Sequence, residues 1–252
     1  MKISILLALL LTSNMAFSAE TYELRTYHLN SAEHAAQWDG WMAASGLAGM
    51  KKSGATKVGA FKVKLGEGDA DHSRIVLAVY PSLAVIKPVD GAAVLPKHAN
   101  KKAEAYLAVP PKEPAYSRIE TSLLTAFPGF THLVDPAGDG GKGRYFELRV
   151  YENPSERLAA LKVEMFGKGG EIEVFTEAGL RSVFYGSARI APNLPQLTYM
   201  LVHEDEDAFA KAWKGFRKSE AWDKLKKNTR YKGTVSKVHR TMLVALPFSE
   251  LK

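Results

Sequence analysis

Polar and apolar residues alternate in two short, closely similar segments of the chain. These segments read YELRTY at residues 22–27 and FELRVY at residues 146–151. Alternation with a period of two is typical of a β-strand. Both segments are therefore predicted to be strands, and their similarity indicates an internal repeat.

Each predicted strand leads into a segment whose apolar residues have helical spacing. Asn30 and Asn153 stand before these segments, and each has a glutamate three residues later. Asparagine followed by glutamate at this distance resembles a capping box, so both are predicted helix N-caps. The apolar stripes consist of Ala35, Trp38 and Met42 in the first stretch and Leu158, Leu161 and Met165 in the second.

The elements that follow keep the same order in both stretches. Strands are predicted at 58–65 and 74–80 in the first stretch and at 181–190 and 196–203 in the second. A second helix then leads to a closing strand, which ends in LLTAFP at 123–128 and in LVALP at 243–247. The matched landmarks lie about 120 residues apart. Each half of the chain is therefore predicted to run β-α-β-β-α-β.

This order predicts an α+β fold. A β-α-β-β-α-β unit forms a four-stranded antiparallel sheet with both helices on one face. The other face is uncovered, and two units can bury these faces together. We therefore expect two ferredoxin-like βαββαβ repeats that pair through their sheets into a pseudo-dimeric α+β barrel. The predicted boundaries are 19–128 for the first repeat, 129–143 for a Pro/Gly-rich linker and 144–252 for the second repeat.

The first residues have the pattern of a secretory signal peptide. Lys2 supplies a positive charge, residues 3–11 are apolar, and small residues stand at Ala16 and Ser18. This pattern predicts a signal peptide at 1–18 that is cleaved after Ser18 or Ala19. We therefore expect a periplasmic or secreted protein with no transmembrane segment after cleavage, since no later apolar run is long enough to span a bilayer.

Composition removes several kinds of chemistry. The chain has no cysteine, which excludes disulfides, a thiolate nucleophile and cysteine-ligated metals. Its formal net charge of +7 favours acidic ligands or envelope surfaces. Lysine and arginine are frequent between residues 211 and 237, with Trp213 and Trp222 among them. Because the tryptophans have the spacing of a buried helix stripe, we interpret this stretch as a solvated helix face and expect no nucleic-acid partner.

The two opening strands carry a resemblance to a known family. Together with SEAW at 219–222 and ALPFS at 245–249, they resemble the NIPSNAP family within the wider dimeric α+β barrel group. The second half matches better than the first. The resemblance implies two NIPSNAP-like repeats of ferredoxin-like fold, and it implies little about activity. Relatives with this barrel include cofactor-free monooxygenases and haem enzymes, but shared fold is a weak argument for function.

Strand alternation also predicts a candidate site. One face of the two opening strands carries Glu23, Arg25, Tyr27, Glu147, Arg149 and Tyr151. If the apolar residues of the other face pack under the helices, these polar residues point into the barrel from both halves. Buried charges are costly unless they are paired. Two interpretations stay open: a polar cavity that binds an acidic or carbonyl-bearing molecule, or internal Glu–Arg bridges that fix the barrel.

Other motifs of catalysis or metal binding are weak. The seven histidines show neither His-x-His nor His-Glu-x-x-His spacing. His203 and His239 are the leading candidates for a haem or metal ligand because they lie on or near predicted strands. We expect no metal site and no cofactor, and the sequence does not name a catalytic residue.

Three functional hypotheses follow. The first is an exported NIPSNAP-like protein of undefined activity that binds a small acidic or carbonyl-bearing molecule between its repeats. The second is a cofactor-free oxidoreductase or monooxygenase-like enzyme that uses the same cavity. The third is a structural or interaction module with a filled barrel. The sequence does not decide whether the protein is an enzyme, and it leaves homo-oligomer formation open.

Overall fold

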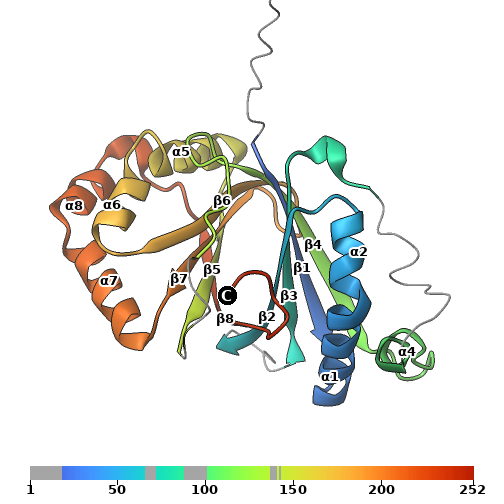
Figure 1. Ribbon diagram of the computed structural model, residues 1–252. Coiled ribbons are helices and arrows are strands. Elements are labelled where there is room, and N and C mark those ends of the chain that lie inside the picture. Colours follow the sequence, from blue (N-terminus) through green and yellow to red (C-terminus); the bar gives the residue numbers. More distant parts are fainter. Residues whose placement is uncertain (1–18, 66–71, 88–100, 137–140, 142) are drawn as a thin grey trace, which may run out of the picture.

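A computed structural model describes residues 19–65, 72–87, 101–136, 141 and 143–252 (Figure 1). The signal peptide predicted at 1–18 lies outside the described residues, as does part of the predicted linker. Within the described ranges, no helix is long and apolar enough to cross a membrane.

Eight strands form a closed antiparallel barrel in the described part of the chain, in the order β1-β3-β2-β8-β5-β7-β6-β4. Each half contributes four neighbouring strands, and the halves join edge to edge where β2 pairs with β8 and β4 pairs with β6. This confirms the predicted fold class. The strands are β1 (Thr21–Leu29), β2 (Lys57–Leu65), β3 (Arg74–Tyr80), β4 (Tyr116–Ala126), β5 (Tyr145–Glu152), β6 (Arg181–Ile190), β7 (Gln196–His203) and β8 (Lys237–Ala245).

The helices form two outer layers on opposite sides of the barrel (Figure 1). The first layer contains α1 (Ala32–Trp41), a wider π-helical turn at Met42–Gly46, α2 (Leu47–Lys52) and α4 (Lys101–Leu107). The second layer contains α5 (Glu156–Phe166), α6 (Glu171–Glu177), α7 (Glu206–Lys218) and α8 (Glu220–Lys226). Short 3₁₀ turns lie at Leu83–Val85 and Thr229–Tyr231.

The two predicted helix caps are wrong by one and two residues. Ser31 caps α1 and Ser155 caps α5, each accepting a hydrogen bond from the backbone N–H three residues later. The asparagines fix strand ends instead. The side chain of Asn30 donates to the carbonyl of Pro114 at 2.7 Å, and that of Asn153 donates to the carbonyl of Thr234 at 2.6 Å. In each half an asparagine thus ties the end of the opening strand to the chain before the closing strand.

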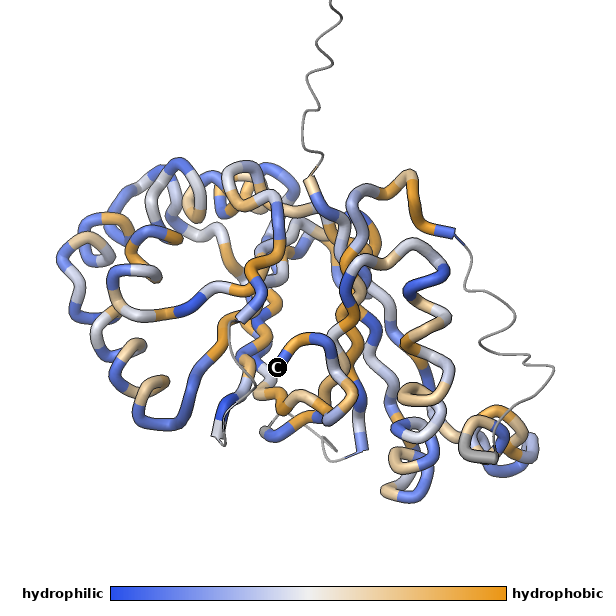
Figure 2. Tube along the Cα trace, viewed as in Figure 1, coloured by the Kyte–Doolittle hydropathy of each residue, from blue (hydrophilic) through white to orange (hydrophobic). Residues whose placement is uncertain are grey.

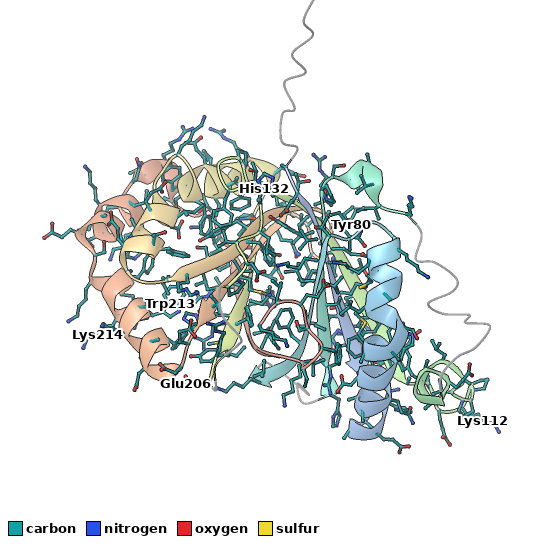
Figure 3. All side chains as sticks on the ribbon, in the orientation of Figure 1. Tyr80, Lys112, His132, Glu206, Trp213 and Lys214 are labelled. Atoms are coloured by element: carbon teal, nitrogen blue, oxygen red, sulfur yellow. The ribbon has the colours of Figure 1, made fainter. Side chains whose placement is uncertain are left out.

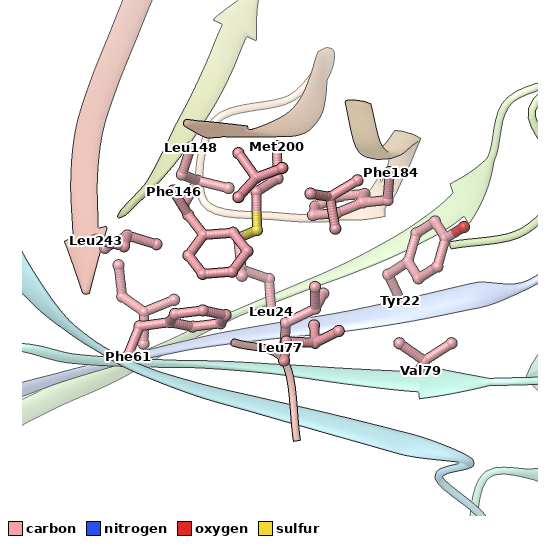
Figure 4. Packing of buried hydrophobic residues seen from close by; sticks show 14 of the residues in the cluster. Tyr22, Leu24, Phe61, Leu77, Val79, Phe146, Leu148, Phe184, Met200 and Leu243 are labelled. Atoms are coloured by element: carbon pink, nitrogen blue, oxygen red, sulfur yellow. The ribbon is translucent and has the colours of Figure 1, made fainter. Parts of the chain in front are cut away.

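Apolar side chains of the described residues form three separate cores. One lies inside the barrel and draws on both halves, with Phe61 and Phe146 in edge-to-face contact at 5.0 Å between ring centroids (Figure 4). The other two lie between the barrel wall and each helical layer. Figure 2 shows apolar positions recurring along the central strands and hydrophilic positions along the outer helices. Both faces of the strands that lie beneath the helical layers are therefore buried.

The predicted orientation of the opening strands is wrong. Tyr22, Leu24 and Leu148 belong to the core inside the barrel, whereas Tyr27 and Tyr151 belong to the cores beneath the helices. The Glu-Arg-Tyr faces therefore point outward, toward the helical layers. The physical reason is that both strand faces are covered, so apolar side chains are stabilised equally well by the barrel interior. Alternation identifies the two faces but not which of them faces inward.

The C-terminal segment closes one end of the barrel. Leu251 is fully buried among the interior residues. The segment is fastened to β2, because the backbone N–H of Val58 donates to Glu250 Oε2 at 2.7 Å and that of Ala60 donates to Ser249 Oγ at 2.9 Å. Since these contacts lie at the start of β2, the opposite end of the barrel is left for a cavity.

Candidate functional site

A cavity of about 660 Å³ lies at the end of the barrel opposite the C-terminal segment. Its walls come from both repeats, at the ends of β1, β2 and β5 and the beginnings of β3, β4, β7 and β8. The apolar lining consists of Leu24, Leu29, Val63, Ile75, Leu148, Val150 and Pro192. The polar lining includes Thr26, His28, His72, Arg118, Glu120, Ser122, Asn193, Gln196, His239 and Thr241. The volume is ordinary for a site that holds a small organic molecule.

One wall of the cavity carries a histidine–carboxylate pair from the first repeat. His28 on β1 lies 3.3 Å from Glu120 on β4, measured from Nε2 to Oε2. Arg118 Nε donates to the other carboxylate oxygen of Glu120 at 2.7 Å. Burial acts to raise the pKa of Glu120, but its contacts with Arg118 and His28 outweigh burial and hold the pKa below its ordinary value. Glu120 is therefore an ionised carboxylate that is shared between two cationic or polar partners.

A second histidine–carboxylate pair comes from the second repeat. His239 Nε2 on β8 lies 2.7 Å from Glu152 Oε1 on β5, within hydrogen-bond distance. Asn193 Nδ2 donates to the same carboxylate oxygen at 3.3 Å. The histidine side chain is 31% exposed and the glutamate side chain 24%. The imidazole is therefore oriented by its partner and still accessible from the cavity.

The two pairs occupy equivalent positions in the two repeats, but the histidine and the glutamate have exchanged strands. Thr26 on β1 is paired with Glu120, and Val150 on β5 is paired with His239. Two residues further along the opening strands stand His28 and Glu152. The opening strand thus provides the base in the first repeat and the acid in the second, and the closing strand provides the opposite member.

Strand order places the two pairs on opposite walls. β1 and β4 are neighbours, as are β5 and β8, and two strands separate these couples on either side of the barrel. A molecule in the cavity therefore lies between the His28–Glu120 pair and the His239–Glu152 pair.

The structure places the first predicted site triplet under the first helical layer. Arg25 lies 2.6 Å from Glu23, its neighbour on the same face of β1. Tyr80 on β3 donates to the other oxygen of Glu23 at 3.1 Å. Tyr27 packs on Trp38 with 5.1 Å between ring centroids. The polar groups of this triplet are bonded to one another and to the surrounding core.

The second triplet lies under the second helical layer and is more deeply buried. Glu147 is fully buried and accepts hydrogen bonds from Arg149 Nε at 2.8 Å and from Trp213 Nε1 at 2.8 Å. His203 Nε2 lies 3.0 Å from the same carboxylate. Burial acts to raise the pKa of Glu147, but the hydrogen bond with His203 and the charge of Arg149 hold the pKa below its ordinary value.

The two triplets do not meet. Trp213 and Tyr80, which bond the two glutamates, lie on opposite sides of the barrel (Figure 3). Arg149 stacks over the Trp213 ring at 4.0 Å, and Tyr151 shares a 2.8 Å hydrogen bond with Tyr199. The structure therefore brings each triplet together within its own repeat and does not form one polar site from both. Their role in ligand binding stays a prediction.

Of the residues that surround the cavity, sequence reasoning selected His239 but not His28, Arg118 or Glu120. The signal was present, because alternation places His28 on the face of Leu24 and Glu152 on the face of Leu148. Choosing the wrong inward face excluded them. His239, singled out as a candidate ligand, lies at the cavity, whereas His203 lies beneath a helix. Across the residues described, no group of three or more His, Asp or Glu side chains is arranged to hold a metal.

Fold and cavity together define an α+β barrel protein made of two ferredoxin-like units in one chain. Residues 146–250, which make up most of the second repeat, match the NIPSNAP family model. No protein of curated function matches the chain in sequence.

Solved structures share the whole barrel. A candidate monooxygenase from Lactobacillus acidophilus NCFM is 12% identical, with a TM-score of 0.55 and coverage of 90% of this chain and 94% of that chain. A candidate monooxygenase from Fusobacterium nucleatum is 11% identical, with a TM-score of 0.56 and coverage of 91% and 94%. An anthrone oxidase-like protein is 10% identical, with a TM-score of 0.52 and coverage of 90% and 92%. At these identities the similarity shows the fold alone.

Proposed function

We propose that this protein binds a small acidic or carbonyl-bearing molecule in the cavity between its repeats. The observation that carries the proposal is the combination of an apolar lining and polar groups from both repeats around one cavity of about 660 Å³. Sites for small molecules typically have this combination, in which apolar surface supplies affinity and a few polar groups fix orientation.

The arrangement of the walls indicates how the ligand lies. Leu24, Leu148 and Val150 belong to strands that run on into the apolar interior. A hydrocarbon or aromatic part of the ligand is stabilised there by about 25 cal/mol for each Å² removed from water. Arg118 and the two histidines lie closer to the strand ends, where they can bind a carboxylate or carbonyl oxygen.

The binding role is assigned to these residues rather than to the Glu-Arg-Tyr triplets. Arg25 and Arg149 lie beneath the helices and are engaged by Glu23 and Glu147. An anion that displaced either glutamate would leave a buried carboxylate without its partner, which is costly. The triplets are therefore better suited to holding the helical layers on the barrel.

A second candidate function is a cofactor-free oxidoreductase or monooxygenase-like reaction in the same cavity. The observation that favours it is the presence of two histidine–carboxylate pairs, which can move protons to or from a bound molecule. The fold shared with candidate monooxygenases is consistent with it, as an argument by analogy. The third hypothesis, a filled barrel, is disfavoured by the cavity.

We also propose that the protein acts outside the cytoplasm. The pattern of residues 1–18 supports export to the periplasm or beyond. N-terminal sequencing of the protein purified from its own host tests this. A mature chain that begins at Ala19 or Glu20 is the expected result, and a chain that begins at Met1 contradicts it.

Binding is tested with an aromatic anion and its neutral analogue. The probes are 1-anilinonaphthalene-8-sulfonate and N-phenyl-1-naphthylamine, whose fluorescence rises in an apolar site. We expect Val150→Trp, which fills the cavity, to weaken binding of both probes at least about tenfold. Val238→Trp is the matched control because Val238 lies on the outer face of β8 and is 47% exposed. Equal binding by both variants contradicts a site in the cavity.

Native mass spectrometry of the protein from its own host complements the probes. A retained small molecule identifies the class of ligand, and the same spectra measure whether two copies associate. A carboxylic acid or carbonyl compound is the expected result. A retained organic cation contradicts the proposed ligand class.

A further inference from the structure

We infer that His239 is a proton acceptor and that the cavity catalyses proton transfer from a carbon next to a carbonyl group. This inference rests on the proposed binding function and adds a reaction to it. The substrate class is an enolisable carbonyl compound, such as a 2-oxo acid with an aromatic or alkyl tail. The pair His239–Glu152 supplies the base, and the opposite wall, with Arg118 and His28, receives the negative charge that forms on oxygen.

The geometry of His239 supports its role as the base. Its Nε2 lies 2.7 Å from Glu152 Oε1, so Nε2 carries the proton of this hydrogen bond. The other ring nitrogen, Nδ1, then has a lone pair that can accept a proton. Glu152 is itself held by Asn193, which fixes the carboxylate as well as the ring. An oriented histidine that is accessible from a cavity is the most frequent general base in proteins.

The pairs His239–Glu152 and His28–Glu120 differ in their partners. These differences indicate which pair acts as the base and which wall binds the negative charge. Glu152 has an uncharged amide partner in Asn193, whereas Glu120 is bonded to the guanidinium of Arg118. His28 Nε2 is buried and lies 3.3 Å from Glu120 without a well-formed hydrogen bond. The first pair therefore has a cationic partner in Arg118, and the second pair has a neutral partner in Asn193. An anion formed in the cavity is stabilised on the side of Arg118, away from the base.

The reaction balances without a cofactor or an oxidant. The C–H bond next to the carbonyl breaks, and its proton moves to Nδ1 of His239. The electron pair of that bond forms the C=C bond of an enolate, and the carbonyl oxygen takes the negative charge. Arg118 donates a hydrogen bond to this oxygen, on the wall that also carries His28. Return of a proton to carbon or to oxygen gives the keto or the enol form and restores neutral His239.

Phenylpyruvate is a suitable probe because it is an acidic aromatic compound that interconverts between keto and enol forms. The interconversion is followed by the ultraviolet absorbance of the enol, and exchange of the methylene protons is followed by NMR in deuterated water. We expect the wild-type protein to accelerate both. His239→Asn is expected to lose at least about 100-fold in rate. His34→Asn is the matched control because His34 lies on α1, outside the cavity lining.

Three further variants separate a catalytic from a structural effect. Added imidazole is expected to restore part of the rate to His239→Gly, which a merely structural histidine would not allow. Glu152 is a positioning residue, so Glu152→Gln is expected to lower kcat with little change in KM. Arg118→Gln is expected to raise KM and also to lower kcat, since Arg118 contacts both substrate and enolate.

Calorimetric titration with phenylpyruvate distinguishes failure of the reaction from failure of binding. Binding without acceleration overturns this inference and leaves the proposed binding function standing. No binding contradicts the proposed ligand class and overturns the inference with it. Acceleration that survives in His239→Asn overturns the role of His239.

Discussion

Glu152 on β5 occupies the position in the second repeat that His28 occupies on β1 in the first. Their partners on the closing strands are exchanged in the same way, because Glu120 corresponds to His239. Each repeat therefore keeps one acid and one base at this end of the barrel while reversing their order. A reversed pair preserves the attraction between the two strands, so the strand ends are held together in both halves.

Reversing the first pair should be tolerated, whereas changing one member should not. His28→Glu places two carboxylates together and is expected to lower the free energy of unfolding by about 1 kcal/mol or less. The double variant His28→Glu/Glu120→His is expected to recover most of this loss. Urea denaturation of the single and double variants measures the coupling. Additive effects would show that the two side chains do not interact.

Removing Glu147 should cost more stability than removing Glu23. Glu147→Leu leaves His203, Trp213 and Arg149 buried without their shared acceptor, at a cost of about 3 to 5 kcal/mol. Glu23→Leu removes the acceptor of Arg25 and Tyr80 at a less enclosed position, so its cost is expected to be smaller. Both values follow from urea denaturation. A larger loss for Glu23→Leu would contradict the proposed difference in burial.

The contribution of Glu147 should depend on pH in a defined direction. The pKa of Glu147 in the folded protein lies below its ordinary value, so folding favours the carboxylate form. Its contribution is therefore complete above the ordinary carboxyl pKa and is lost as the pH falls through the lower folded-state value. The stability difference between wild type and Glu147→Gln should be constant above the ordinary carboxyl pKa and should shrink as the pH falls below it. Denaturation curves at several pH values measure this, and a growing difference would reverse the assigned sign.

Leu251 should be a principal anchor of the closed end of the barrel. Its side chain is fully buried in the interior core, so Leu251→Ala is expected to cost about 2 to 5 kcal/mol. Leu194→Ala is the matched control, because Leu194 is 54% exposed and should change stability little. Thermal unfolding of both variants tests the difference. Similar melting temperatures would show that the C-terminal segment is loosely attached.

Much of the fold could be predicted from local pattern. Alternation found the strands, and the predicted ranges 74–80, 181–190 and 196–203 agree with β3, β6 and β7. The same pattern did not predict which strand face points into the barrel. Tyr22 and Tyr27 lie on opposite faces of β1, and both are buried. Alternation of polar and apolar residues distinguishes a buried face from an exposed one, so it cannot identify the inward face of a strand that is buried on both faces.

The cavity was harder to predict because closure of the barrel creates it. His28 and Glu120 are far apart in the chain, as are Glu152 and His239, and strand register brings each couple together. Pairing registers follow from the whole sheet and not from any short segment. The helix caps were predicted wrongly for a related reason. Asn30 and Asn153 donate hydrogen bonds to carbonyls that lie far along the chain, and a local sequence pattern does not show such contacts.

The two repeats are joined where β2 pairs with β8 and where β4 pairs with β6. These two junctions determine how substitutions can alter the cavity. In a barrel assembled from two identical chains, symmetry copies every substitution onto the facing wall. Here both junctions join parts of a single polypeptide, so a substitution alters only one wall of the cavity. One side of the cavity can therefore specialise in removing a proton while the other specialises in holding charge.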